Sequence, residues 1–437
     1  MPEPHTHVPF GEAVRAWTRI ALQSFGGPAG QIAVIHRVVV DEKKWLDEPR
    51  FLHALSYCML LPGPEAQQLV TYTGWLLHGV RGGLTAGLLF VLPGFLTILA
   101  LSVTYALYQQ TTLVTALFFG LKPAVVAIVV EAIVRLGKRA LTRRSDYAIA
   151  AAAFLAIFTL AVPFPLIVVG AALLGMLREV LRPVAAGGAE GAAVIVRPRI
   201  GRLLRTTGIW LLVWSVPFLI IMLIPGRSPV LLQEAIFFSE AALVTFGGAY
   251  AVLAYLAQQA VHVYHWLSPT EMLDGLGLAE TTPGPLIMVV QFVGFLGAYR
   301  SPGALSPLLA GVIGSVVTVW VTFAPCFLFI FAGAPYVEWL RGRRQVQAAL
   351  RGIMAAVVGV VVNLALWFAL HVAFGTVVRM PAGPLQLWVP DVSSVSWPAV
   401  GIAAVALVAV LRFRAGLFVV LLGGAALGLA AVRLTHP

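Results

Sequence analysis

The chain has 437 residues, of which 60% are hydrophobic and 11% are charged, and its mean hydropathy is +0.92. Soluble domains carry about 25% charged residues, so this composition excludes a water-soluble globular protein and is typical of a polytopic helical membrane protein. The formal charge is +11, but most Lys and Arg fall in loops, where the positive-inside rule accounts for them without a nucleic-acid partner.

The first half of the chain begins with two apolar segments that Gly and Pro interrupt. Phe25-Gly26-Gly27 breaks the first segment, and Pro62-Gly63-Pro64 breaks the second. Long apolar runs over residues 84–108 and 113–134 come next, followed by two shorter runs on either side of residues 163–165. A bilayer core of about 30 Å needs about 20 apolar residues per helix, so each long run predicts a membrane-spanning helix.

The middle of the chain predicts a linker and one extra membrane helix. Residues 183–198 are rich in Gly and Ala, and an apolar run over residues 206–224 follows them. Runs over residues 305–332 and 415–432 are again long enough, or nearly so, to span. The sequence therefore predicts three parts. They are an N-terminal repeat (1–181), a cytoplasmic linker with an inverting transmembrane helix (182–229), and a C-terminal inverted repeat (230–437).

The second half repeats the breaks of the first half at a constant offset. Phe246-Gly247-Gly248, Trp266-Leu267 and Pro283-Gly284-Pro285 match Phe25-Gly26-Gly27, Trp45-Leu46 and Pro62-Gly63-Pro64, because 246 − 25, 266 − 45 and 283 − 62 all equal 221. Such ungapped self-similarity indicates an internal duplication. Interrupted apolar segments at matching positions in two halves are the sequence pointer to a transporter binding site.

Loop charges predict that the two repeats have inverted topology. The basic clusters lie at residues 135–144, 178–205, 341–344 and 412–414, and we place all four in the cytoplasm. Each loop of the first repeat then has its counterpart on the other side of the membrane. Residues 109–112 lie outside and their counterpart 341–344 inside, and residues 135–144 lie inside and their counterpart 371–397 outside. Residues 163–165 lie outside and their counterpart 412–414 inside. If the interrupted segments cross fully there are about 13 spans, and if they are re-entrant hairpins about nine; the sequence leaves both open.

The breaks themselves carry the predicted substrate chemistry. Gly and Pro leave backbone groups without helical partners, and such breaks persist in a membrane only against protein, water or a ligand. A helix that restarts after Pro64 or Pro285 directs free N–H groups and a partial positive charge at its start, which suits an anion. The alternative is that Gly and Pro only permit kinks and close helix packing. The predicted substrate-binding residues at the breaks are Gly26, Gly27, Gln31, Arg37, Pro62, Gly63, Pro64, Gln67 and Gln68, together with Gly247, Gly248, Thr281, Thr282, Pro283, Gly284 and Pro285.

Lys122 and Arg351 form a second predicted pair of substrate-binding residues. Both are predicted to lie at helix starts in equivalent places, where a cation is unfavourable for the helix dipole, which suggests that they hold a tetrahedral oxyanion. The alternative is an interfacial side chain that snorkels to water. Glu131 is a weak candidate for the carboxylate that pairs with Lys122.

Glu65 and Glu280 flank the two Pro-Gly-Pro segments and are the candidates for carrying a coupling proton. An intramembrane carboxylate is costly and is a functional candidate by default. The alternative for Glu65 is to cap the helix that starts there. No nucleotide-binding, hydrolase or Cys/His metal-site motif occurs, so we expect no enzyme activity, no cofactor and no metal.

The ordered motifs of both halves resemble one family. Ser24-Phe25-Gly26-Gly27-Pro28-Ala29-Gly30-Gln31 and Leu61-Pro62-Gly63-Pro64-Glu65-Ala66-Gln67-Gln68 resemble signatures of the chromate ion transporter (CHR) family. Ala279-Glu280-Thr281-Thr282-Pro283-Gly284-Pro285 looks like that family's C-terminal homologous domain.

The resemblance implies a long-chain, two-domain member that exports chromate across the bacterial inner membrane by alternating access. Membrane potential, with or without proton coupling, would drive the export. The alternatives are a transporter of sulfate or another oxyanion and, less favoured, an anion channel. Expected partners are the oxyanion, the lipid bilayer and a second copy of the chain in a homodimer.

Overall fold

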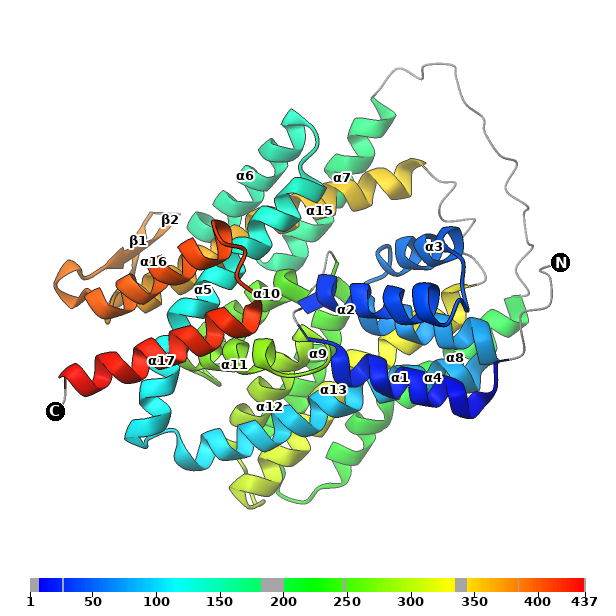
Figure 1. Ribbon diagram of the computed structural model, residues 1–437, viewed down its shortest axis with the longest axis horizontal. Coiled ribbons are helices and arrows are strands. Elements are labelled where there is room, and N and C mark those ends of the chain that lie inside the picture. The colour runs from blue at the N-terminus through cyan, green and yellow to red at the C-terminus, as the bar shows by residue number, and fades with distance from the viewer. Residues whose placement is uncertain are drawn as a thin grey trace. The chain divides into compact units, whose positions relative to one another are not determined.

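The computed structural model describes residues 8–25, 27–181, 200–246, 249–334, 344–383 and 385–435 (Figure 1). Within these residues six helices are long and apolar enough to cross a membrane. They are α4 (Glu65–Tyr108), α5 (Thr112–Ala140), α8 (Ile200–Leu223), α13 (Pro307–Gly333), α15 (Arg344–Ala373) and α17 (Leu417–Thr435). Five of the six carry the five long apolar runs, so the prediction of a multi-pass, all-α membrane protein is confirmed.

The chain divides into two compact units, and each unit draws on both halves of the sequence. Unit 1 comprises Met1–Leu99, Met176–Ala249 and Thr282–Leu350, and unit 2 comprises Ala100–Gly175, Tyr250–Thr281 and Arg351–Pro437. All four predicted break segments fall within the ranges of unit 1. Lys122, Glu280 and Arg351 fall within unit 2.

Unit 1 begins with short helices. They are α1 (Phe10–Gln23), α2 (Gly27–His36), which continues into a π-helical turn (Arg37–Glu42), and α3 (Glu48–Cys58). In α1 the residues Ala13, Trp17 and Ile20 are fully buried, which is the spacing that puts apolar side chains on one face of a helix. This face packs in one core with Phe51 and Phe90.

The remaining helices of unit 1 pack around α13. They are α8, α9 (Pro229–Val244) and α12 (Val289–Arg300), which follows a 3-10 turn (Leu286–Met288). Gly294 of α12 lies against Gly314 of α13, and a Cβ atom added to Gly314 would lie 2.5 Å from the Gly294 carbonyl oxygen. Small residues of this kind allow two membrane helices to approach closely.

The long helix α4 is two helical segments joined at a kink. His78 and Gly79 have non-helical backbone angles, with φ of −135° and +58° respectively. Glycine adopts positive φ without a steric penalty, which explains why the helix bends at this position.

Unit 2 is built on α5. The helices α11 (Pro269–Thr281), α16 (Trp397–Leu411) and α17 pack against it, and unit 2 also contains α6 (Arg144–Leu160) and most of α7 (Phe164–Val180) and α10 (Ala249–His262). Gly120 of α5 lies against Gly424 and Gly428 of α17, with no room for a side chain on any of the three.

One antiparallel β-hairpin lies in the segment that was predicted only as an external loop. Its strands are β1 (Val377–Ala382) and β2 (Leu385–Pro390), and Arg379 lies directly opposite Trp388. A 3-10 turn (Val392–Ser394) follows. The hairpin is missing from the predicted fold class, because a two-stranded element leaves little signal in a chain dominated by apolar helices.

The helices that flank the breaks are short. α1, α2 and α3 have 14, 10 and 11 residues, and their counterparts α9, α10 and α11 have 16, 14 and 13. None reaches the roughly 20 residues that a straight crossing needs. These lengths favour re-entrant hairpins over full spans in both halves.

Backbone details also recur at the offset of 221 residues. Lys44 and His265 both have φ of +53°, a left-handed conformation that is uncommon for residues other than glycine. The next residues make matching turns: Trp45 donates its backbone N–H to Val39 O at 2.9 Å, and Trp266 donates to Ala260 O at 2.8 Å.

Candidate functional site

The Pro-Gly-Pro segment of each repeat is hydrogen-bonded to the residue that precedes Phe-Gly-Gly in the other repeat. Gly284 donates its backbone N–H to Ser24 O at 2.8 Å, and Gly63 donates its backbone N–H to Thr245 O at 2.7 Å. Because 245 − 24 and 284 − 63 both equal 221, these are the same contact made twice with the repeats exchanged. Both glycines have positive φ, +119° for Gly63 and +101° for Gly284. Hydrogen bonds thus join the break regions of the two repeats inside unit 1.

A buried hydroxyl residue ends the helix before each Gly-Gly segment. Ser24 Oγ donates to Ile20 O at 2.6 Å, and Thr245 Oγ1 donates to Ala241 O at 2.5 Å. Each hydroxyl satisfies a carbonyl of the last helical turn, which otherwise has no partner at a helix end. Ser24 and Thr245 were not predicted as site residues, although the hydroxyl before Phe-Gly-Gly in both repeats was a signal.

Buried glutamines hold the main chain of the breaks. Gln31 donates its Nε2 to Gly284 O at 2.6 Å, so both polar backbone groups of Gly284 are bonded to the first repeat. Gln68 donates its Nε2 to Pro62 O at 2.7 Å. Gln31 and Gln68 are 2% and 0% exposed. The structure thus brings together predicted residues from both repeats.

Several buried polar atoms near the breaks have no hydrogen-bond partner among the described residues. They include the Oε1 atoms of Gln67, Gln68 and Gln291. The amide nitrogens fix the orientation of two of these side chains, because Gln68 Nε2 donates to Pro62 O at 2.7 Å and Gln291 Nε2 donates to Phe95 O at 2.9 Å. An unpaired buried acceptor costs about 1–3 kcal/mol, so these oxygens suit a water, a proton donor or a cation.

The helix starts at the breaks supply donors as well. α4 begins at Glu65 directly after Pro64, and the 3-10 turn before α12 begins at Leu286 directly after Pro285, as predicted. The first amides of a helix have no acceptor within it and suit an anion. The region therefore presents both donors and acceptors, which is what binding a hydrated or proton-coupled anion requires.

Other predicted break residues occupy different surroundings. The Thr281 hydroxyl donates to Leu278 O at 2.8 Å, and Thr282 is 4% exposed. Gly27 starts α2 with φ of +72°. Gly26, Gly247 and Gly248 lie outside the described residues.

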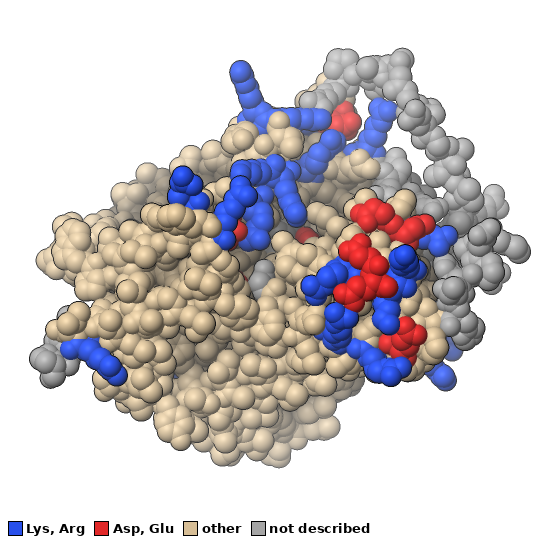
Figure 2. All heavy atoms as spheres, viewed as in Figure 1, with Lys and Arg blue, Asp and Glu red and all other residues tan. Residues whose placement is uncertain are grey.

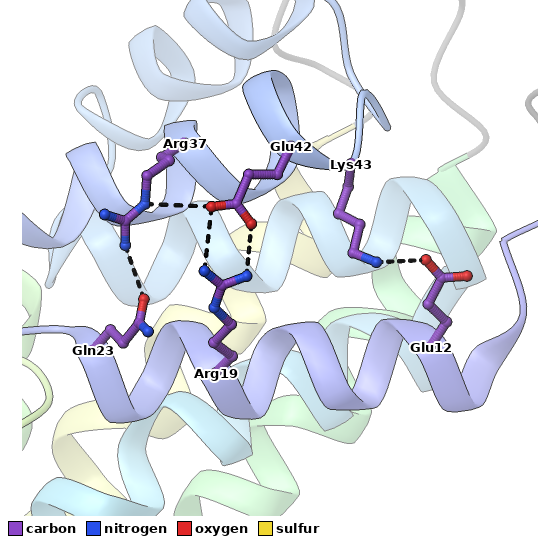
Figure 3. Close-up of polar contacts among 6 residues, drawn as sticks. All are labelled: Glu12, Arg19, Gln23, Arg37, Glu42 and Lys43. Atoms are coloured by element: carbon purple, nitrogen blue, oxygen red, sulfur yellow. Dashed lines mark hydrogen bonds and ion pairs between the residues drawn. The ribbon is translucent and has the colours of Figure 1, made fainter.

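Arg37 makes its ion pair and hydrogen bond with side chains outside the predicted break residues. Its side chain is half exposed and contacts Glu42 at 3.7 Å and Gln23 Oε1 at 2.8 Å, within a group of ion pairs on α1 and the π-helical turn (Figure 3). Arg19 pairs with Glu42 at 2.6 Å, and Lys43 pairs with Glu12 at 2.8 Å. The hydrogen bond and the charge of Lys43 lower the pKa of the Glu12 carboxyl. Figure 2 shows a patch of intermixed blue and red on this face, and a second group that is mainly blue in the upper part of the view.

Lys122 makes a buried ion pair that was not predicted. Its Nζ atom lies 3.3 Å from Asp274 Oδ1, and Tyr105 donates its hydroxyl to Asp274 Oδ2 at 2.8 Å. Asp274 is 4% exposed. The three residues border a cavity of about 220 Å³ in unit 2, which is also lined by Gln109, Thr115, Phe118, Ser268, Thr270 and Glu271.

Two expectations about the second pair are wrong. Neither cation starts a helix, because Lys122 lies in the interior of α5 and Arg351 lies within α15. The glycines near these two cations mark close helix packing: Gly120 lies against α17, and Gly352 lies against Ala171 of α7. Glu131 pairs with Arg135 at 3.8 Å, one turn away, rather than with Lys122.

The two candidate proton carriers differ in their surroundings. Glu280, which is 3% exposed, accepts a hydrogen bond of 2.7 Å from the Tyr250 hydroxyl. Glu65 is half-buried at the first position of α4, where an acidic group also stabilises the helix start. A further carboxyl, Glu234 of α9, is 0% exposed beside the close approach of α12 and α13, and sequence patterns gave no indication of it.

Comparisons with known proteins point to one family. The family described as "Chromate transporter" matches residues 11–176 and 232–429, two segments whose starts are again 221 residues apart. A chromate transport protein of Pseudomonas aeruginosa is 32% identical over 78% of this chain and 77% of its own length. A chromate transport protein of Cupriavidus metallidurans is 26% identical over 86% of each chain, and a probable chromate transport protein of Synechococcus elongatus is 27% identical over 82% and 84%. No solved structure matches the chain.

Proposed function

Because the chain belongs to the chromate transporter family, we propose that it is a secondary transporter that exports chromate from the bacterial cytoplasm across the inner membrane. Chromate is a tetrahedral dianion, and sulfate has the same charge and shape. A transporter of sulfate or another oxyanion is therefore the alternative, and an anion channel is a less favoured one.

The reciprocal pairing of the breaks is the observation that carries this proposal. Gly284 with Ser24 and Gly63 with Thr245 join the two repeats through their interrupted segments, which is where transporters of duplicated fold hold their substrate. The buried amides of Gln31, Gln67 and Gln68 surround this pairing. We place the substrate there, with the backbone of Gly27, Pro62, Pro64, Pro283 and Pro285 as the supporting frame and Thr281 and Thr282 as further candidates.

Alternating access would follow from inversion of the repeats. A two-fold relation between repeats produces reciprocal contacts of the kind seen here. The loop charges favour inverted repeats. Inverted repeats are related by a two-fold axis that lies in the membrane plane. In an inverted pair each repeat takes the conformation of the other when the site changes sides.

Membrane potential gives a physical reason for export. Moving one charge through 100 mV is worth about 2.3 kcal/mol, so a dianion that leaves a negative interior gains about 4.6 kcal/mol. At about 1.4 kcal/mol per decade, this gain sustains an outward concentration ratio of roughly a thousandfold. Export therefore needs no proton, whereas uptake of the same dianion would need a co-transported cation. Proton coupling through Glu65 or Glu280 stays a proposal, as does a role for Lys122 or Arg351 at the substrate.

The decisive experiment is uptake of radiolabelled chromate into inverted membrane vesicles. An inside-positive potential should drive accumulation, unlabelled sulfate should compete if the site reads shape and charge, and preloaded chromate should accelerate exchange. The absence of potential-driven chromate accumulation would overturn the proposal. Flux far faster than carrier turnover, without counterflow, would favour the channel.

A further inference from the structure

A small cavity in unit 2 lies between the β-hairpin and three helices. Its volume is about 40 Å³, and its polar lining consists of Gln258 and His262 of α10, Asn363 and Trp367 of α15, and Arg379 and Trp388 of the hairpin. We call it the hairpin pocket. None of its lining residues belongs to the two breaks or to the cavity at Lys122.

The hairpin presents a cation on an aromatic ring. Arg379 and Trp388 are cross-strand partners, and the Arg379 guanidinium lies 5.4 Å from the centre of the Trp388 ring. An arginine held by a ring in this way is positioned for binding without being neutralised by a carboxylate. The His262 ring lies 5.3 Å from Trp388 and 5.6 Å from Trp367, which fixes the three rings around the pocket.

The fixed charge at the pocket is positive. No Asp or Glu occurs among its lining residues. Arg379 carries the one fixed charge among them. A bound anion would therefore meet this guanidinium without competition from a carboxylate in the lining.

Two buried polar atoms of the pocket lack hydrogen-bond partners among the described residues. They are Trp367 Nε1 and Gln258 Oε1, and Trp367 is 5% exposed. An indole N–H is a donor only, so its missing partner must be an acceptor. Buried donors of this kind are normally satisfied, and each exception calls for a water or a ligand.

We propose that the hairpin pocket binds a small tetrahedral oxyanion of the sulfate or chromate class, held by the Arg379 guanidinium and the Trp367 indole N–H. A volume of about 40 Å³ holds roughly three waters, which fits an inorganic oxyanion and excludes an organic metabolite. The choice of sulfate or chromate as the anion rests on the proposed function. The presence of the Arg379 and Trp367 donors in the pocket does not depend on it.

Equilibrium binding of radiolabelled sulfate to the detergent-purified full chain tests the proposal. Arg379→Gln should weaken one class of sulfate site by at least about tenfold, the size expected for one charge-assisted hydrogen bond. Trp367→Phe keeps an aromatic ring but removes the indole N–H donor, and should weaken sulfate binding at the same site several-fold. Arg412→Gln, which removes an exposed cation of unit 2 outside the pocket, is the matched control and should bind like wild type.

The outcomes separate this site from the proposed function. Gly63→Ala should lose chromate transport yet keep the Arg379-dependent sulfate site. If chromate transport is absent from wild type but sulfate binding still requires Arg379, the hairpin pocket stands and the proposed function falls. The proposal would be overturned if folded Arg379→Gln protein bound sulfate with wild-type affinity. It would also be overturned if chloride at matched ionic strength displaced the bound radiolabelled sulfate as well as unlabelled sulfate does.

Discussion

Gly284 donates its backbone N–H to the carbonyl of Ser24 at 2.8 Å, and so joins the second Pro-Gly-Pro segment to the residue before the first Phe-Gly-Gly segment. The equivalent bond joins Gly63 to Thr245 at 2.7 Å. A residue at either glycine must combine positive φ with close neighbours: a Cβ on Gly63 would lie 2.9 Å from Cys326 Sγ, and one on Gly284 would lie 3.3 Å from Gly94 Cα. Backbone conformation and packing therefore both select glycine at these positions.

Gly63→Ala and Gly284→Ala should each abolish chromate transport. Alanine at positive φ costs of the order of 1–3 kcal/mol, and relief of this strain would break the cross-repeat bond. Gly383→Ala is the matched control, because Gly383 has φ of +64° but nothing within 4 Å of its added Cβ atom. Vesicle flux and thermal stability should be compared for the three variants. Normal flux in both break variants would contradict a transport role for the pairing.

The Lys122–Asp274 pair can be tested by a double-mutant cycle. Lys122→Gln leaves the Asp274 carboxylate buried without its counter-charge and should lower the melting temperature by several degrees. Adding Asp274→Asn should restore stability, because both charges are then removed. If Lys122 also contacts the oxyanion, chromate transport will stay absent in the stable double variant.

Recovery of transport together with stability would assign Lys122 a structural role only. The exposed Arg135–Glu131 pair provides the control. Removing both of its charges should change stability by less than about 1 kcal/mol.

Proton coupling predicts a specific change in Glu280→Gln. With voltage clamped by potassium in proteoliposomes, a pH gradient should accelerate flux through wild type but not through this variant. Glu65→Gln tests the other candidate in the same assay. Tyr250→Phe is the graded control, because it keeps the Glu280 carboxyl but removes the hydrogen bond it accepts. Flux through wild type that ignores the pH gradient would remove both carboxyls from the transport cycle.

Substitution at two adjacent glycines of α17 should change protein stability by different amounts. Gly424 lies against Gly120 of α5, whereas a Cβ atom on Gly423 meets nothing within 4 Å. Gly424→Leu should destabilise the detergent-purified protein by at least about 1–3 kcal/mol, because the two helices must separate. Gly423→Leu should leave the melting temperature within about two degrees of wild type, since an open-facing substitution changes stability by no more than about 0.5 kcal/mol. Equal effects would show that α5 and α17 do not pack through Gly424.

The membrane helices and the restart after each proline followed from local sequence. Apolar length specifies a span, and Pro64 and Pro285 fix where the next helix begins, because both signals act within one turn or one helix. The cross-repeat bonds did not follow, since Gly284 and Ser24 meet through main-chain groups that leave no side-chain pattern. Only the constant offset suggested that the four segments belonged together.

The partner of Lys122 was missed for a related reason. Nearby charge pointed to Glu131 on the same helix, whereas Asp274 lies on α11 and is brought to α5 by the packing of unit 2. The predicted helix start at Lys122 was wrong although Pro123 follows it, because a proline inside a membrane helix is tolerated when neighbouring helices cover the freed backbone group. The hairpin pocket was likewise not predicted, because its residues come from four separate stretches of the chain.

The left-handed turn at Lys44 and His265 has a consequence for how the duplicated halves diverged. A non-glycine residue with φ of +53° carries a conformational cost of the order of 1 kcal/mol, and this chain bears that cost at the same place in both halves. The side chains at these positions differ, as do those of Gln68 and its counterpart Val289. The main chain thus has the same conformation at this turn in both halves, although the side chains differ. A symmetric ancestor with two equivalent substrate contacts can become an asymmetric carrier by point substitution alone, with no change of backbone.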